Sequence, residues 1–178
     1  MTVYIVLFRG VGGATQLPVK PLREKLTEAG FENVATYINS GNAVLKTRLG
    51  REKVIARIAE ICAREFGFNK DVHAPTAEEW RALIANNPFP EAEGVPKFLH
   101  AAVLESEPDA AKVEAVRQYA VDGERIEVVG KVAYLHTPNG FGTSKMAERF
   151  DKAIGVANTA RNWNTVRKLM ELAEAAGG

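Results

Sequence analysis

The sequence predicts an α/β protein of the α+β type, built from two ferredoxin-like split β-α-β halves with mainly antiparallel sheets and helices packed on one face. The first observation is that an order of strand, helix, strand, strand, helix occurs twice along the 178 residues. The second is a single linker-like stretch at 86–96, which is rich in proline, acid and asparagine. We therefore expect a first half at 1–88 and a second half with a C-terminal helix at 89–178, together forming one compact unit.

The first half begins with a nearly continuous apolar run, Val3–Phe8, which predicts a central strand buried on both faces. A helix should follow, because Pro18 and Pro21 bracket its start and Gly30 can end it. Apolar spacing and turn residues predict the remaining elements of this half: strands at 34–39, 43–47 and 71–74, a helix at 51–66, and a helix ending at 84 that opens with a Thr76/Glu79 capping box.

The second half repeats the pattern after the linker. A helix capped at 106–109 should present Val113, Val116 and Tyr119 on one face. The other predicted elements are strands at 97–104, 126–129 and 132–136, a helix at 144–154 with inward Met146, Phe150 and Ile154, and a last helix at about 163–175.

The split β-α-β topology makes a spatial prediction. In such a half the first and second strands run parallel, and the third lies between them in the opposite direction. Arg9 and the loop at 10–13 should therefore lie near the hairpin turn Ser40-Gly41-Asn42, although about thirty residues separate them.

The composition limits the partners and the cellular compartment that we expect for the protein. We find no stretch with the ~20 apolar residues of a membrane helix and no signal-peptide pattern, so we expect no membrane partner. Cys62 is the only cysteine, which fits a reducing compartment, and we expect a cytoplasmic location. It lies on the apolar stripe of its helix, as an inert buried thiol would.

Charge is unevenly distributed along the chain. The net charge is +1, but the segment 131–170 has seven basic residues against two acidic ones, so it carries +5 and the remainder −4. This segment favours either an anionic partner or ordinary solvated helix faces.

The first candidate binding segment is Arg9 with the loop at 10–13. Backbone N–H groups of Gly12 and Gly13 can approach an anion, and Arg9 can form two hydrogen bonds with it. The spacing is not that of the dinucleotide fingerprint. The alternative is a glycine-rich turn that leaves a buried strand.

The second candidate is the turn Ser40, Gly41 and Asn42. Asn and Gly permit the positive φ of a tight turn, which is a sufficient structural explanation. Ser40 could also bind a ligand or act as a nucleophile, but no neighbouring residue in the sequence offers a base.

The third candidate is the helix start at Ser144 and Lys145. Free N–H groups and a lysine favour an anion there. The order Gly-Thr-Ser-Lys is not that of a P-loop, and adjacent Ser and Lys do not face each other on a helix. The structural alternative is Thr143 or Ser144 as a helix cap.

The fourth candidate is Arg161 with Asn162. Asn162 can cap the last helix, and Trp163 can anchor that helix in the core. Arg161 before a helix start meets an unfavourable dipole unless a carboxylate or a ligand anion lies between them, so both a structural role and anion binding remain open for Arg161.

The remaining polar residues do not indicate a particular chemistry. His73, His100 and His136 each lie on a predicted strand without a second ligand at metal spacing, so we expect no metal and no cofactor. Glu91 and Glu93 lie in the linker and are typical of solubilising charge.

Several segments occur together and in one order: 7–10 (LFRG), 36–42 (TYINSGN), Ser144-Lys145 and 159–165 (TARNWNT). This set resembles the domain-of-unknown-function family 1697, a group of uncharacterised, mostly bacterial proteins, over nearly the whole chain. The resemblance implies a two-layer fold with ferredoxin-like halves and no established activity. Family members have a longer first loop of the form Arg-Gly-Ile-Asn-Val-Gly-Gly, followed by polar and basic residues. The loop at 9–16 here lacks that Asn and basic residue.

Three functions of different classes follow from these segments. The first is binding of a small anionic, phosphate-bearing ligand by the four candidates. The second is a hydrolase or transferase that uses Ser40 or Ser144. The third is nucleic-acid binding by the +5 segment and a sheet face, which ranks last because Tyr4 and Phe8 lie on a strand predicted to be buried.

Overall fold

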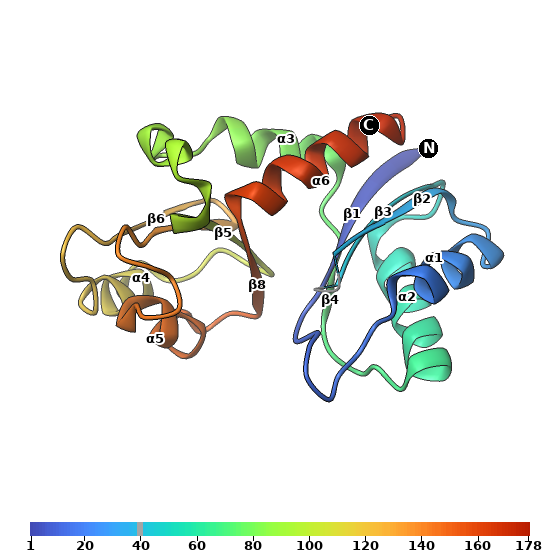
Figure 1. Cartoon of the computed structure of the whole chain (residues 1–178), viewed down its shortest axis with the longest axis horizontal. Helices are drawn as coiled ribbons and strands as arrows, with labels where there is room; N and C mark the ends of the chain where they lie inside the picture. The colour runs from blue at the N-terminus through green and yellow to red at the C-terminus, as the bar shows by residue number, and fades with distance from the viewer. Residues whose placement is uncertain (39–40) are drawn as a thin grey trace. The chain divides into compact units, whose positions relative to one another are not determined.

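The computed structural model describes residues 1–38 and 41–178 (Figure 1). These residues form two compact units. Unit 1 contains residues 1–82 together with 168–178, and unit 2 contains residues 83–167. The helices α3 (Ala77–Ala85) and α6 (Trp163–Ala175) each continue from one unit into the other. The end of the C-terminal helix therefore belongs with unit 1, whereas the sequence pattern predicts that it belongs with the second half.

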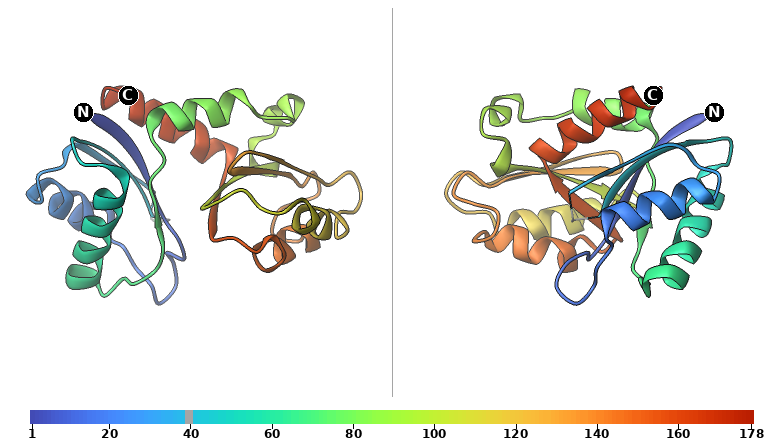
Figure 2. Two further views of the ribbon diagram at one scale, coloured as in Figure 1. Left: turned by 180° about the vertical axis from the view of Figure 1, so that it is seen from behind. Right: turned by 45° about the vertical axis from the view of Figure 1, so that its right-hand side comes forward.

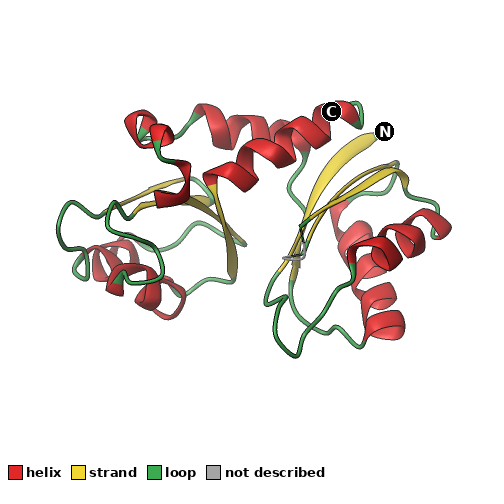
Figure 3. Ribbon diagram, in the orientation of Figure 1, coloured by secondary structure: helices red, strands yellow, loops and turns green. Residues whose placement is uncertain are grey.

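Unit 1 has the ferredoxin-like topology that the sequence predicts. Its sheet has the strand order β2-β3-β1-β4, with antiparallel pairing throughout, and α1 and α2 lie on one face (Figure 3). Its elements are β1 (Thr2–Phe8), α1 (Val19–Glu28), β2 (Glu32–Tyr37), β3 (Asn42–Thr47), α2 (Arg51–Phe66) and β4 (Val72–His73).

The core of unit 1 explains why β1 is apolar at almost every position. Tyr4, Val6 and Phe8 belong to the hydrophobic cluster that includes Leu26 and Ile58 of the helices. The alternate residues of the strand, which face the other side, are buried too, so the prediction of a strand buried on both faces is confirmed: Val3, Ile5 and Leu7.

The helix ends in unit 1 follow the residues that predicted them. Gly67 ends α2 in the left-handed conformation, and its N–H donates to the Ala63 carbonyl at 3.1 Å. The capping box before α3 is confirmed, since the Thr76 N–H donates to Glu79 Oε2 at 2.9 Å and the Glu79 N–H donates to Thr76 Oγ1 at 3.1 Å.

Unit 2 repeats the same topology, with the strand order β6-β7-β5-β8 and antiparallel pairing. The helices α4 and α5 lie on one side of this sheet (Figure 2). The fourth strand, β8, was missed by the sequence analysis, which found a polar stretch there. Its elements are η1 (Pro90–Gly94), η2 (Pro96–Phe98), β5 (Leu99–Leu104), α4 (Ala110–Arg117), β6 (Arg125–Val129), β7 (Val132–His136), α5 (Lys145–Ile154) and β8 (Asn158–Asn162).

The hydrophobic cluster of unit 2 lies between the sheet and the helices α4 and α5. Met146, Phe150 and Ile154 are buried in it, as predicted. Val116 is also buried, but Tyr119 is 39% exposed, so its predicted inward position is wrong. The reason is that α4 ends at Arg117, and Tyr119 therefore leaves the apolar face of the helix.

The linker-like stretch is ordered in two 3-10 turns, η1 and η2. Its carboxylates are not simply solvated, because Glu91 pairs with Arg125 and Glu93 pairs with Arg167 at 3.0 Å. Within the described part of the chain, no helix combines the length and the apolar character needed to cross a membrane.

Candidate functional site

The carboxyl end of β1 brings together segments that are far apart in the sequence. The Phe8 N–H donates to the Gly41 carbonyl at 2.9 Å, and the Arg9 N–H donates to the Asp71 carbonyl at 3.0 Å. The predicted proximity of the first loop to Gly41 is therefore confirmed. Ser40, the other residue proposed in this turn, lies outside the described residues.

Gly41 and Asn42 both have structural roles at this end of the sheet. Gly41 has φ +76°, and a Cβ there would lie 2.5 Å from Val11 Cγ2 and 2.9 Å from Phe8 Cβ. Asn42 is 1% exposed, and its Nδ2 donates to the Tyr37 carbonyl at 3.2 Å. The specific pair Gly-Asn therefore fits the close approach and the hydrogen bonding of the turn.

Ile38 stands at the start of the same turn in a conformation that side chains with a branched Cβ rarely adopt. Its φ is +45°, and 48% of the residue is exposed. Such strain persists where the surrounding structure imposes it, and it is common near binding sites. The sequence carried no signal for this feature, since isoleucine is an ordinary strand residue.

The glycine loop closes on itself through a pair of backbone hydrogen bonds. The Gly12 N–H donates to the Thr15 carbonyl at 2.7 Å, and the Thr15 N–H donates to the Gly12 carbonyl at 3.0 Å. The N–H groups of Gly10, Val11 and Gly13 make no hydrogen bond with the described residues. The loop thus offers three backbone donors, although Gly12 would have to exchange its bond to Thr15 before it could contribute.

Lys70 adds a cation that the sequence analysis missed. Its Cγ lies 3.8 Å from the position that a Cβ would take on Gly10, so its side chain packs against this residue of the loop. Lys70 forms no ion pair or hydrogen bond with residues 1–38 or 41–178. Because Lys70 is far from Arg9 in the sequence, no local sequence pattern indicates that it contributes to this site.

In unit 2, the predicted cap at the start of α5 is confirmed. Ser144 is 5% exposed, and its Oγ accepts the Ala147 N–H at 3.1 Å. Lys145 follows it on the exposed surface. A nucleophilic role for Ser144 would require the loss of this cap and access to a buried hydroxyl.

An aromatic stack precedes α5. The rings of His100 and Phe141 are stacked with a centroid distance of 3.7 Å and an interplanar angle of 16°. Burial lowers the pKa of His100 to about 4, so its imidazole is neutral at pH 7. Phe141, between Gly140 and Gly142, was not recognised as a partner of His100 because only the fold brings them together.

Arg161 lies in β8 rather than in a helix-capping loop. Its Nη1 donates to Thr159 Oγ1 at 2.7 Å and to the Ala160 carbonyl at 2.8 Å. The side chain is half-buried, and burial lowers its pKa to about 10. An anion nearby would favour the charged guanidinium and oppose this shift.

Strand alternation separates Arg161 from Lys145. Asn158 faces α5, because its Nδ2 donates to Asp151 Oδ1 at 3.1 Å, and Ala160 packs against the same cluster. Arg161 must therefore point to the opposite face of the sheet. The Asn162 Oδ1 accepts the Thr165 N–H at 3.0 Å, which confirms Asn162 as a cap of α6.

The surroundings of the other titratable candidates, Cys62 and His136, indicate structural roles. Burial raises the pKa of the Cys62 thiol to about 12, and the residue is fully buried. The His136 Nδ1 lies 3.1 Å from Arg125 Nη2, and burial together with that cation lowers the His136 pKa. No group of three or more His, Cys, Asp or Glu side chains that could hold a metal ion occurs within residues 1–38 and 41–178.

Comparison with known proteins gives a family and a fold. The chain is similar to a solved structure described as the conserved bacterial protein SP0830 from Streptococcus pneumoniae, with 21% sequence identity and a TM-score of 0.73 over 97% of this chain and 98% of that one. No curated protein matches the chain. A family model described as a protein of unknown function, DUF1697, matches residues 1–134. The chain therefore belongs to the DUF1697 family.

Proposed function

We propose that this protein binds a small anionic, phosphate-bearing ligand at the carboxyl end of β1 in unit 1. The observation that carries the proposal is the group of N–H donors on Gly10, Val11 and Gly13 in a loop that begins at the basic residue Arg9 and packs against the basic side chain of Lys70. Backbone N–H groups in a turn with positive φ form a concave surface that favours anions.

The chemistry of this loop favours binding over catalysis. It supplies donors and positive charge, both of which complement phosphate oxygens, and charge-assisted hydrogen bonds are among the strongest in proteins. The alternative of a hydrolase or transferase would need a nucleophile with an adjacent base. The described residues of the loop include no histidine or carboxylate side chain.

The setting that we infer is a bacterial cytoplasm. Its support is the similarity to a bacterial protein and the single cysteine, Cys62, which is buried in its reduced form.

The proposal is tested by titrating the purified protein with inorganic phosphate, nucleotides and sugar phosphates, using thermal shifts and calorimetry. A ligand at 100 times its Kd stabilises the native state by about 2.7 kcal/mol. The variants Arg9→Gln and Lys70→Gln should each bind the best ligand about tenfold to a hundredfold more weakly, because each loses a charged donor.

The matched controls are Arg48→Gln, at the opposite end of the sheet, and Lys131→Gln, in unit 2. Both should bind as the unmodified protein does. If Arg9→Gln and Lys70→Gln retain full affinity, or if no phosphate compound shifts the melting temperature, the proposal is wrong. Parallel titrations of Lys145→Gln and Arg161→Gln measure any contribution from the candidates of unit 2.

A further inference from the structure

A groove runs between α1 and α2 on the helical side of unit 1, away from the glycine loop. Its volume is about 660 Å³. Ala29, Ala56 and Ile61 contribute small apolar surface, and the rest of the lining is charged. We call it the α1–α2 groove.

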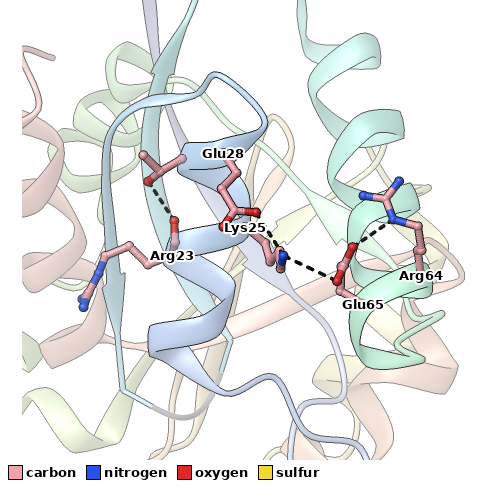
Figure 4. A network of polar contacts seen from close by, with 6 residues as sticks. Arg23, Lys25, Glu28, Arg64 and Glu65 are labelled. Atoms are coloured by element: carbon pink, nitrogen blue, oxygen red, sulfur yellow. Dashed lines mark hydrogen bonds and ion pairs between the residues drawn. The ribbon is translucent and has the colours of Figure 1, made fainter.

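The three carboxylates of the α1–α2 groove are already paired. Lys25 Nζ lies 3.0 Å from Glu28 Oε2 and 3.9 Å from Glu65 Oε2 (Figure 4). Arg64 Nε lies 3.0 Å from Glu65 Oε1, and its Nη1 lies 3.9 Å from Glu60 Oε1. Two cations, Lys25 and Arg64, therefore engage all the acidic groups of the groove.

The other two cations of the groove have no such partners. Lys53 and Arg57 form no ion pair with any described carboxylate, and Arg57 lies over the Phe31 ring with its Cζ 5.9 Å from the centroid. They are four residues apart on α2, so their side chains are neighbours and repel each other. A bound anion would relieve this repulsion.

We propose that the α1–α2 groove docks an acidic peptide segment of a partner protein through Lys53 and Arg57. Neighbouring side chains four apart on a helix are about 5–6 Å apart. Carboxylates with a similar separation occur at i and i+4 of a helix or at i and i+2 of a strand. The carboxylates Glu28, Glu60 and Glu65 in the same groove would repel a continuous polyanion, so the mixed charge favours a peptide over a nucleic acid.

The test measures the binding of a fluorescein-labelled peptide that carries two glutamates at i and i+2 among neutral residues, by fluorescence anisotropy in 50 mM NaCl. The double variant Lys53→Gln/Arg57→Gln should bind at least about fivefold more weakly, as expected for the loss of two exposed ion pairs. The control is Lys145→Gln/Arg149→Gln, which removes two basic residues with the same helical spacing from the exposed surface of α5. Melting temperatures should confirm that both double variants are folded.

The expected result is weaker binding only for the groove variant, together with a loss of affinity in 300 mM NaCl. Equal affinity of the groove variant and the unmodified protein would overturn the proposal, as would absence of peptide binding to the unmodified protein or an equal loss in the control. An octadeoxynucleotide that displaces the peptide with similar affinity would overturn the choice of a peptide. Lys70→Gln should leave peptide binding unchanged, so failure at the glycine loop and failure at the groove are distinguishable.

Discussion

The close approach of Gly41 to the first loop makes the substitution Gly41→Ala a sharp test of the site geometry. A side chain at φ +76° costs about 1–2 kcal/mol in conformational strain. The new Cβ would also lie 2.5 Å from Val11 Cγ2 and 2.9 Å from Phe8 Cβ, and overpacking of this kind costs about 1–3 kcal/mol. The two contributions together reduce the free energy of unfolding by about 2–5 kcal/mol.

The matched comparison is Gly13→Ala, which also places a side chain at positive φ, +56°, but meets no atom within 4 Å. It should cost only the conformational part, about 1–2 kcal/mol. Urea unfolding, followed by circular dichroism, gives both values, and a loss of 3 kcal/mol corresponds to a melting temperature about 6–12 °C lower.

A double variant isolates the steric part. Val11→Ala removes the Cγ2 that the new methyl group would meet, so Gly41→Ala should cost about 1 kcal/mol less in that background. The reasoning is refuted if Gly41→Ala destabilises the protein no more than Gly13→Ala, or if the effects of Gly41→Ala and Val11→Ala are additive.

Three further predictions concern buried polar groups. Because the folded pKa of His100, about 4, lies below its ordinary value of 6.5, the protein should lose stability as the pH falls from about 6.5 to 4, by about 2 kcal/mol between pH 7.5 and 5. The variant His100→Phe should abolish this loss while keeping the stack on Phe141. An unchanged pH dependence of this variant in urea melts would contradict the assignment to His100. Cys62 should react with a thiol reagent only in denaturant, and rapid modification of the native protein would show that it is accessible. Ser144→Ala should lower the free energy of unfolding by about 1 kcal/mol through loss of the α5 cap, while Ser144→Asp should retain it; equal losses in both variants would exclude a capping role.

The elements that sequence analysis located best are those with both a clear periodicity and a defined end. The helix predicted at 51–66 is α2, because an apolar stripe fixes its face and Gly67 fixes its end. β8 was missed, since it is an edge strand of mostly polar residues in which Ala160 alone packs into the core cluster. Its pairing with β5 makes it a strand of the sheet, although its own sequence does not indicate a strand.

The candidate site likewise combines features that the sequence predicts with features that only the fold reveals. Topology alone predicted that the first loop approaches Gly41, and the hydrogen bond from Phe8 confirms it. Lys70 was missed because its position beside Gly10 depends on the β1–β4 pairing, which brings together residues about sixty positions apart. The stack of Phe141 on His100 was missed for the same reason.

Unit 1 is formed by two separate stretches of chain, and these stretches become available for folding at different times during synthesis. The Asn33 side chain donates to the Ala176 carbonyl at 3.2 Å, a contact that spans 143 residues. On the ribosome, residues 1–82 emerge long before 168–178, and all of unit 2 is synthesised in the interval. Both units have a complete four-stranded sheet within one uninterrupted stretch, and the hydrophobic cluster of unit 1 lies within residues 4–74, so unit 1 lacks only the contacts of the end of α6 until synthesis finishes. Nascent chains that stop before residue 168 should therefore carry the sheet and helices of unit 1 without the contacts that the end of α6 makes with them, such as the hydrogen bond from Asn33 to the Ala176 carbonyl.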